Sequence, residues 1–429
     1  MRAGTLCLAR ASFGAYTRAM KLYPFRAIRP APAHAQRVLS PPYDVVSTAE
    51  ARAYAEGNAA CYFHISRAEI DLPDAADPHG DAVYALAGDA LRRFLAEGLL
   101  VRDPGETLWV YRLRQGDHVQ TGFVGAVSVD DYRAGRIKRH ELTRAAKEDD
   151  RTRHILACGA QTGPILLACR TSAALNAVAE RLTAGPPSVE VTGKDAVVHS
   201  IWPVPAAELG ALEAAFGPLD AFYIADGHHR AASAARARDQ LVAQGHGDGP
   251  WQRFLAVVFP DDQLRILDYN RVVADLNGHS SAAFLAAVSE RFEIGPPGAP
   301  AAPEARHSFG MYLDGAWRRL VAKPHVVPEA DPIGRLDVAI LQAQLLAPIL
   351  GIGDPRTDER IDFVGGSRGT AELARRVDAH GGGVAFAMFP TSLDELFAVA
   401  DAGLIMPPKS TWFEPKLGSG LFLNEIAVR

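Results

Sequence analysis

The chain has 429 residues, with 45 Lys and Arg against 50 Asp and Glu, so its formal net charge is −5. This mild acidity argues against a protein whose whole surface binds nucleic acid, because such a surface needs a large excess of basic residues. Hydrophobic residues make up 48% of the chain, which excludes disorder of the whole chain. No apolar run approaches the roughly 18 residues that span a bilayer. We therefore expect neither a nucleic acid nor a membrane as a partner.

The four cysteines, Cys7, Cys61, Cys158 and Cys169, form no C-x-x-C pair. Their spacing therefore indicates neither a zinc knuckle nor a disulfide framework. Free thiols fit a reducing compartment, so we expect a cytoplasmic protein. The oligomeric state stays open.

The first 19 residues carry Arg2, Arg10 and Arg18 and no acidic residue. This composition resembles a transit peptide, but it also arises when the start is assigned upstream of the true one. We favour the second interpretation, since Met20 opens a more typical beginning, and leave the choice between Met1 and Met20 open. Residues 1–19 are predicted to be a disordered extension outside the fold.

Helix and strand patterns alternate along the rest of the chain. An amphipathic helix is predicted over 81–97, ended by Gly98, followed by a hairpin of strands 107–114 and 119–129. The further predicted elements up to residue 269 are a helix at 143–158, strands at 164–169 and 221–225, an Ala-rich helix at 231–243, and strands at 253–259 and 264–269.

The stretch 295–305 is rich in Pro and Gly and supports neither a helix nor a central strand. We expect a core of residues 20–294, a linker at 295–307 and a smaller α/β portion at 308–429 that returns a loop to the site. This last portion is predicted to contain a hairpin over 308–322 and helices at 337–350, 371–379 and 393–401, the last behind a Ser392-x-x-Glu395 capping box.

The sharpest chemical signal is the sequence Asp226-Gly227-His228-His229-Arg230 between the strand at 221–225 and the Ala-rich helix. Gly227 permits a turn with positive φ, and the helix start offers free N–H groups and a positive dipole end. Beside two imidazoles and a guanidinium, these groups form an anion site suited to phosphate. Asp226 is then a candidate base or metal ligand.

Two other interpretations of this turn remain open. In the first, Asp226 caps the helix, as Asp commonly does, and the two histidines pack and form hydrogen bonds locally. A metal site at His228 and His229 is less favoured, because H-x-x-x-H spacing is absent.

A second group of polar residues lies on the predicted helix at 143–158. Lys147, Asp150, Arg151 and His154 share one helix face, and His140-Glu141 precedes the helix. A salt-bridged surface helix and a functional site are equally compatible with this pattern.

A third group lies near the C-terminus, where Lys409-Ser410-Thr411 and Lys416 offer two ammonium groups and two hydroxyls in a Pro-stiffened loop. These groups suit phosphate oxygens, alone or with Mg²⁺. The alternative is a tail held against the core by Trp412 and Phe413. Weaker signals are the turn Pro41-Pro42-Tyr43-Asp44, which offers another acid, and the Gly-rich stretch 365–370 before a helix.

Together these motifs resemble one bacterial and archaeal family, domain-of-unknown-function family 1015. The residues that carry the resemblance are Phe25-Arg26, the turn 41–44, His140-Glu141 with Lys147, Asp150 and Arg151, the run 225–230, and 408–411 with 415–416. The resemblance covers nearly the whole chain from Met20, but the family name implies no function.

The turn at 226–230 also resembles, more remotely, the phosphate-binding turn of the ParB/sulfiredoxin superfamily. That likeness implies an α+β fold: a ParB/sulfiredoxin-like core with a mixed sheet and flanking helices. Sulfiredoxins place a catalytic Cys where this chain has His228, and partition proteins place a Glu-Arg pair where His228 and His229 stand, so neither activity is implied. Free-serine kinases carry the same Asp-Gly-His-His-Arg turn.

The resulting hypothesis is a phosphotransferase for a small hydroxylated metabolite, with free L-serine as the best candidate, a nucleotide or pyrophosphate as donor, and Mg²⁺. Phosphoryl transfer depends mainly on positioning and charge neutralisation. The rivals are a nucleotide-binding regulatory or partition-like module without turnover, and a phosphatase for the same metabolite. The predicted catalytic residues are Asp226, Asp44 and Glu141; the predicted phosphate-binding residues are Gly227, His228, His229, Arg230, Lys409, Ser410, Thr411 and Lys416; the predicted supporting residues are Arg26, Tyr43, His140, Lys147, Asp150 and Arg151.

Overall fold

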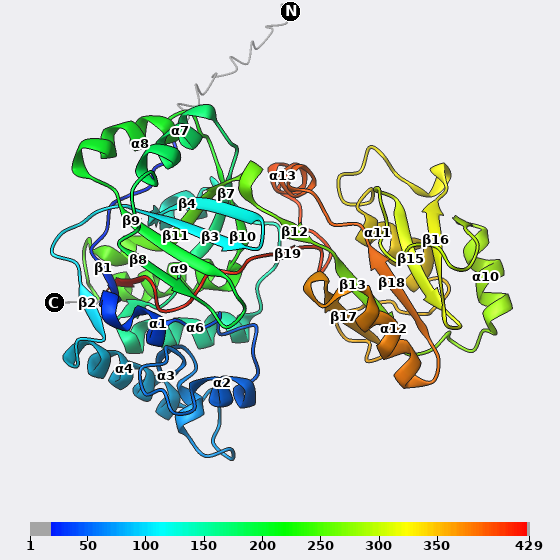
Figure 1. Ribbon diagram of the computed structural model, residues 1–429, viewed down its shortest axis with the longest axis horizontal. Coiled ribbons are helices and arrows are strands. Elements are labelled where there is room, and N and C mark those ends of the chain that lie inside the picture. Colours follow the sequence, from blue (N-terminus) through cyan, green and yellow to red (C-terminus); the bar gives the residue numbers. More distant parts are fainter. Residues whose placement is uncertain (1–18, 427–429) are drawn as a thin grey trace, which may run out of the picture.

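The computed structural model describes residues 19–426, so the predicted extension lies outside the described residues except for Ala19. Figure 1 shows two lobes joined by several crossing segments. The larger lobe (residues 19–260 with 417–426) contains an eight-stranded and a four-stranded sheet, and the smaller lobe (residues 269–388) contains a six-stranded sheet. This mixture of several sheets and helices confirms the predicted α+β class. Within residues 19–426, no helix is long and apolar enough to cross a bilayer.

The eight-stranded sheet is mixed and forms the centre of the larger lobe. Its strands pair antiparallel except for β10 with β5 and β11 with β7, which are parallel. The pairing of β10 with β7 shifts register between Ile224 and Asp226, directly before the predicted phosphate turn. In spatial order the strands are β5 (Ile137–Lys138), β10 (Phe222–Asp226), β7 (Ile165–Cys169), β11 (Arg253–Pro260), β4 (His118–Ser128), β3 (Trp109–Gln115), β9 (Val198–Pro203) and β8 (Val189–Thr192).

Alternate side chains of this sheet enter two different cores, as the period of a strand requires. Phe222 of β10 contacts Phe216 edge to face, at the end of α8 (Leu209–Phe216), beside α7 (Ala173–Leu182). Tyr223, on the opposite face, stacks 4.0 Å from the ring of Phe397 in α13 (Leu393–Asp401). Both faces of the sheet are therefore covered.

Three helices form a layer beside the sheet: α9 (His228–Ala243), α6 (Ala145–Cys158) and α4 (Asp81–Ala96). Small residues let them approach closely. A Cβ at Gly88 of α4 would lie 2.7 Å from the carbonyl oxygen of Ala157 in α6, and the Ala residues of α9 are mostly buried. The predicted helices at 81–97, 143–158 and 231–243 are thus confirmed, although α9 starts three residues earlier, at His228.

The C-terminal segment completes two sheets begun by other parts of the chain. The antiparallel four-stranded sheet has the order β2 (Leu100–Arg102), β1 (Ala27–Pro30), β20 (Leu423–Glu425) and β6 (Ala160–Gln161). Strand β19 (Trp412–Phe413) pairs with β12 (Ile266–Leu267) between the lobes. The short helices of the larger lobe are α1 (Ala35–Val38), α2 (Thr48–Ala55), α3 (Phe63–Ser66) and α5 (Val129–Arg133).

The six-stranded sheet of the smaller lobe is antiparallel. Its order is β14 (Phe292–Ile294), β16 (Ala316–Ala322), β15 (Ser308–Leu313), β18 (Val384–Met388), β13 (Tyr269–Val273) and β17 (Ile361–Gly365). Helices α10 (Ser281–Ser289), α11 (Asp337–Leu341) and α12 (Gly369–His380) belong to the same part of the chain. The predicted hairpin turning at Asp314-Gly315 and the capping box at Ser392 are confirmed.

The chain passes from the eight-stranded sheet to the six-stranded sheet before it reaches the expected linker. Residues 295–307 connect β14 to β15 inside the six-stranded sheet, whereas the chain leaves the larger lobe between β11 and β13. The single strand predicted over 264–269 is accordingly divided between β12 and β13. Pro and Gly mark any long connection, including one between two strands of the same sheet. The helix predicted over 337–350 is α11 followed by a π-helical turn at Gln342–Leu346.

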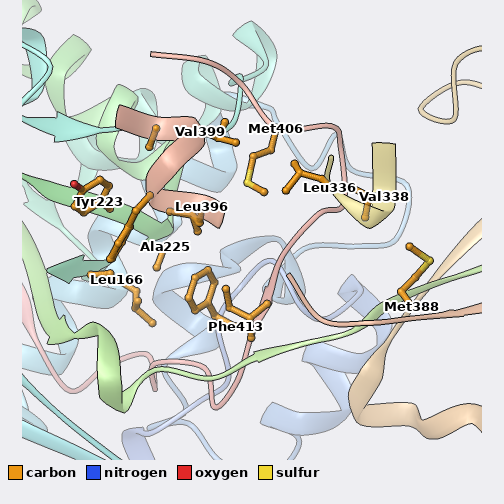
Figure 2. Packing of buried hydrophobic residues seen from close by; sticks show 14 of the residues in the cluster. Leu166, Tyr223, Ala225, Leu336, Val338, Met388, Leu396, Val399, Met406 and Phe413 are labelled. Atoms are coloured by element: carbon orange, nitrogen blue, oxygen red, sulfur yellow. The ribbon is translucent and has the colours of Figure 1, made fainter. Parts of the chain in front are cut away.

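Helix α13 joins the two lobes through a continuous apolar cluster. Figure 2 shows Leu396 and Val399 of this helix beside Tyr223 and Ala225 of β10, with Met406 next along the chain. Asp401, at the end of α13, accepts hydrogen bonds from three side chains of the larger lobe: Tyr223 at 2.7 Å, Lys138 at 2.6 Å and Arg170 at 3.1 Å. These contacts fix where the chain starts its return toward the larger lobe.

Candidate functional site

The turn between β10 and α9 depends on glycine at position 227. Gly227 has φ +100°, a conformation that residues with a Cβ rarely adopt. A Cβ there would also lie 3.0 Å from Nε of Arg230, so it would crowd the guanidinium group. Glycine therefore lets the chain turn and lets Arg230 fold back over the turn.

Asp226 lies between two cations that come from distant parts of the sequence. Its Oδ2 accepts a hydrogen bond from Nη2 of Arg230 at 2.7 Å, and its Oδ1 lies 3.4 Å from Nζ of Lys416. Desolvation raises the pKa of Asp226, but Lys416, Arg230 and His228 outweigh it and hold the pKa at about 2. The carboxylate is therefore ionised at neutral pH.

Arg230 is held from both sides. Besides the ion pair with Asp226, its Nη1 donates to the carbonyl of Pro164, which precedes β7. Its Nε–H is buried and has no hydrogen-bond partner among residues 19–426. The guanidinium thus has a fixed orientation, and its buried Nε–H is a donor without a partner in the described part of the chain.

The two histidines of the turn differ in their surroundings. His228 is buried, with its ring edge to face against His140 at 4.5 Å, and its Nδ1 lies 3.6 Å from the Glu141 carboxylate. Burial lowers the pKa of His228 and brings that of His140 to about 4, so both rings are neutral at pH 7. Nε2 of His229 accepts from the backbone N–H of Arg144 at 3.1 Å.

The predicted C-terminal loop reaches the site with only part of its polar groups available. Lys416 contacts Asp226, and the positive charge of Lys409 acts on Glu141, lowering its pKa against the stronger effects of desolvation and Asp226, which raise it. Ser410 is buried and donates its hydroxyl proton to the carbonyl of Pro407 at 2.6 Å. Thr411 is half-buried beside it. The Ser410 hydroxyl therefore serves the loop itself.

The polar face of α6 meets the turn at 41–44. The guanidinium of Arg151 lies over the ring of Tyr43, 4.5 Å from its centroid, and Arg151 Nε donates to Asp150 at 2.7 Å. Lys147 and Asp44 are exposed, and their charges act in opposite directions on the pKa of His229. These residues therefore surround the turn rather than line a distant helix face.

Arg26 lies elsewhere in the fold. Its Nε donates to the carbonyl of Asp103 at 2.6 Å, beside the four-stranded sheet. Two glycines of the Gly-rich stretch at 365–370 pack against neighbouring side chains. A Cβ at Gly365 would lie 3.0 Å from the Trp412 ring, and one at Gly366 would lie 2.1 Å from Oδ1 of Asp268. These two glycines make room for neighbouring side chains.

Two groups that support the site carried no clear sequence signal. The first is the carbonyl of Pro164, because backbone acceptors are independent of residue type. The second is Arg271, which is 3% exposed and donates to the carbonyl of Lys409 at 3.0 Å. An arginine directly before the apolar pair Val272-Val273 of strand β13 was the available hint. Lys409 itself has φ +58°, so this hydrogen bond braces a strained backbone.

The chain belongs to the DUF1015 family. The family, described as a protein of unknown function, matches residues 22–339, a range that contains β10, α6 and the turn at 226–230. Lys409 and Lys416 lie beyond the matched residues, so the resemblance is confirmed over a shorter range than the sequence motifs indicated. No curated protein matches the chain in sequence.

Several solved structures are distantly similar to this one, each with 14% sequence identity. SbnI with a C-terminal truncation from Staphylococcus aureus covers 70% of this chain and 87% of its own, with a TM-score of 0.36. Free serine kinase in complex with AMP covers 68% and 86%, with a TM-score of 0.32. A conserved hypothetical protein from Pyrococcus furiosus covers 70% and 95%, with a TM-score of 0.33.

Proposed function

We propose that the protein is a phosphotransferase that moves a phosphoryl group from a nucleotide or pyrophosphate to the hydroxyl of a small metabolite, with free L-serine as the first candidate. The observation that carries the proposal is the position of Asp226, an ionised carboxylate between Arg230 and Lys416 at the start of α9. The proposal includes a ParB/sulfiredoxin-like identity for the eight-stranded sheet with α6 and α9.

The donor phosphate is proposed to bind at the amino end of α9. The backbone N–H groups of His228, His229 and Arg230 make no backbone hydrogen bond within residues 19–426, since the first such bond at this end runs from Ala231 to Gly227. A 16-residue helix adds its positive dipole end. Because the rings of His228 and His140 are neutral, these N–H groups and the side chains of Arg230, Lys416 and Lys409 supply the attraction for phosphate.

Asp226 is proposed to position the acceptor hydroxyl. With a pKa of about 2 it stays ionised and accepts a hydrogen bond from the hydroxyl. In a loose transition state the hydroxyl proton leaves late, so orientation matters more than the basicity of the carboxylate. The two neighbouring cations then face the charge that spreads over the transferring oxygens.

Mg²⁺ is proposed to bind beside the turn together with the phosphates of the donor. Within residues 19–426, no cluster of three or more His, Cys, Asp or Glu is arranged to hold a metal ion alone. Mg²⁺ commonly needs only one or two carboxylates together with substrate phosphates. The charge of Asp226 raises the pKa of Glu141, so the two carboxylates repel each other, and a cation would relieve that repulsion. When bound, the ion would neutralise phosphate charge.

The test is phosphoryl transfer to L-serine from ATP, ADP or pyrophosphate in the presence of Mg²⁺, followed by ³¹P NMR. We expect a phosphomonoester product in the wild-type protein and a loss of roughly 10²- to 10⁴-fold in Asp226→Asn. Asp239→Asn is the matched control, because Asp239 is an exposed acid of the following helix α9 that pairs with Arg133 and Arg238. A wild-type protein that is inactive with every donor would overturn the proposal.

The same samples separate the two rival functions. A nucleotide-binding module without turnover would bind ATP or CTP tightly in equilibrium dialysis and leave it intact. A phosphatase would release inorganic phosphate from phosphoserine faster than it forms the ester from any donor. Either result would replace kinase activity as the interpretation of this site.

A further inference from the structure

A cavity lies beside the Asp226 turn, with Arg230 in its wall. Tyr43 and Arg230 line it together with Arg151 from α6, and Ile165 and Phe254 provide apolar wall. Two guanidinium groups and a phenol therefore meet in one space that protein largely surrounds. The phosphate interactions proposed above use only one of these three groups.

Arg151 is fixed in position and still has donors to offer. Its only hydrogen bond within residues 19–426 runs from Nε to Oδ2 of Asp150, at 2.7 Å. Asp150 is itself held by Tyr84 at 2.9 Å and His79 at 3.0 Å. The Tyr43 ring supports the flat face of the guanidinium. The fork formed by Nη1 and Nη2 is thus oriented and unpaired, which is the geometry that binds a carboxylate through two parallel hydrogen bonds.

Tyr43 connects this fork with the proposed reaction centre. The Arg151 guanidinium lies 4.5 Å from its ring centroid, and Arg230 lines the same cavity. Within the described part of the chain, the Tyr43 hydroxyl makes no hydrogen bond and remains a free donor. Arg230, which lines the cavity, donates a hydrogen bond to Asp226 at 2.7 Å, so the cavity adjoins the proposed reaction centre.

We propose that this cavity holds the carboxylate of the acceptor, so that the substrate is a small hydroxy acid or hydroxyl-bearing amino acid, with Arg151 as its specificity-determining residue. This inference rests on the proposed function and narrows its substrate class. Asp150 already neutralises the charge of Arg151, and the walls are partly apolar. Such a site suits a planar, singly charged carboxylate better than a doubly charged phosphate, whose burial costs more.

The test is direct binding by isothermal titration calorimetry, with and without ADP, using three probes. L-serine has the hydroxyl, amine and carboxylate; D-glycerate lacks the amine; 2-aminoethanol lacks the carboxylate. We expect wild-type protein to bind the first two at least tenfold more tightly than 2-aminoethanol. Arg151→Gln should lose this preference, weakening the two acids roughly 10- to 100-fold, as loss of a charged bidentate contact predicts. Equal affinity of wild type for all three probes, or binding of none, would overturn the proposal.

Two further variants keep the result interpretable. Tyr43→Phe removes one donor without disturbing the Arg151–Asp150 pair, and it should weaken only the acids. Arg92→Gln is the matched control, since Arg92 is an exposed helix arginine that also pairs with a single aspartate; it should retain the preference. The thermal transition of Arg151→Gln shows whether this variant folds. If it does not fold, the Tyr43→Phe variant decides the question. An unchanged preference of Tyr43→Phe for the acids over 2-aminoethanol would then overturn the assignment of the cavity to a carboxylate.

Inorganic phosphate as a fourth probe separates this cavity from the start of α9. Its affinity should fall in Arg230→Gln and remain unchanged in Arg151→Gln, whereas equal losses would make the cavity a phosphate site. Failure of the proposed function can be distinguished from failure of the cavity assignment. Carboxylate-selective binding without phosphoryl transfer would leave the cavity assignment standing and overturn only the catalytic role of Asp226.

Discussion

The ammonium of Lys416 lies 3.4 Å from the carboxylate of Asp226, although the two residues are 190 positions apart in the sequence. The contact exists because the chain crosses to the smaller lobe, forms its sheet, and returns between the lobes through β19. Lys416 is the largest of the influences that lower the pKa of Asp226. The returning segment therefore sets the charge state of the central acid of the site.

Removing this ammonium should change the pH dependence of the site. In Lys416→Met the pKa of Asp226 should rise. Desolvation still raises this pKa, and of the three residues Lys416, Arg230 and His228 only the last two remain to lower it. Activity that needs ionised Asp226 is lost as pH falls through this pKa, so the acidic limb of the kcat/KM profile should move to higher pH. Lys409→Met is the control, since Lys409 acts on Glu141. An acidic limb that moves equally in both variants would contradict the assignment.

Gly227→Ala should destabilise the protein and distort the site together. The substitution strains a backbone at φ +100° and places a Cβ 3.0 Å from Arg230 Nε. We expect a loss of about 1–3 kcal/mol in the free energy of unfolding from urea titration, with most of the phosphate affinity lost. Gly298→Ala provides the comparison, because Gly298 has φ +90° and a Cβ added there would meet nothing within 4 Å. Gly298→Ala should lower the free energy of unfolding through backbone strain but leave the phosphate affinity unchanged.

Local sequence patterns predicted the elements of the site better than its assembly. A strand, a glycine and an Ala-rich segment sufficed to place Asp226 through Arg230 on a strand-to-helix turn, because the backbone preferences involved are local. Burial is a tertiary property, so the sequence did not reveal that His228 packs against His140 or that the Ser410 hydroxyl bonds within its own loop. The same holds for β13, whose sheet is decided by partners 88 to 115 residues away in the chain.

Arg26 illustrates a second limit of sequence analysis. It stands beside Phe25 in a motif on which the resemblance to the family is based, yet its side chain donates to the carbonyl of Asp103 beside the four-stranded sheet. A motif records which residues occur together and does not distinguish a residue that touches a ligand from one that braces a strand. The role of Arg26 is therefore better tested by stability than by activity.

Tyr111 should prove important for keeping the returning segment in place. Its hydroxyl accepts a hydrogen bond from the backbone N–H of Gly418 at 3.1 Å and contacts Nδ1 of His199 at 2.6 Å, all within the core. Tyr111→Phe leaves the Gly418 N–H buried without a partner, which costs about 1–3 kcal/mol. We expect faster hydrogen exchange at 416–420 and a lower kcat.

Tyr312→Phe is the control for this prediction. Its hydroxyl also donates to a side chain, Asp378, but lies in the smaller lobe. Exchange at 416–420 should be unchanged in this variant. Equal exchange at 416–420 in Tyr111→Phe and wild type would show that other contacts, such as the pairing of β20 with β1, suffice to hold the segment.

Three buried histidines should make the fold sensitive to mild acid. Burial lowers the pKa of His140, His154 and His199 to about 4 each, against roughly 6.5 in the unfolded chain. Between these values the unfolded chain binds up to three more protons at these histidines, and the lowered pKa of His228 acts in the same direction. The free energy of unfolding therefore falls as pH decreases from about 6.5 to 4. Urea titrations at pH 7.5, 6 and 5 measure this fall. His154→Gln should make the dependence shallower by about one proton, whereas the exposed His325→Gln should not change it; equal pH dependence in all three proteins would contradict the prediction.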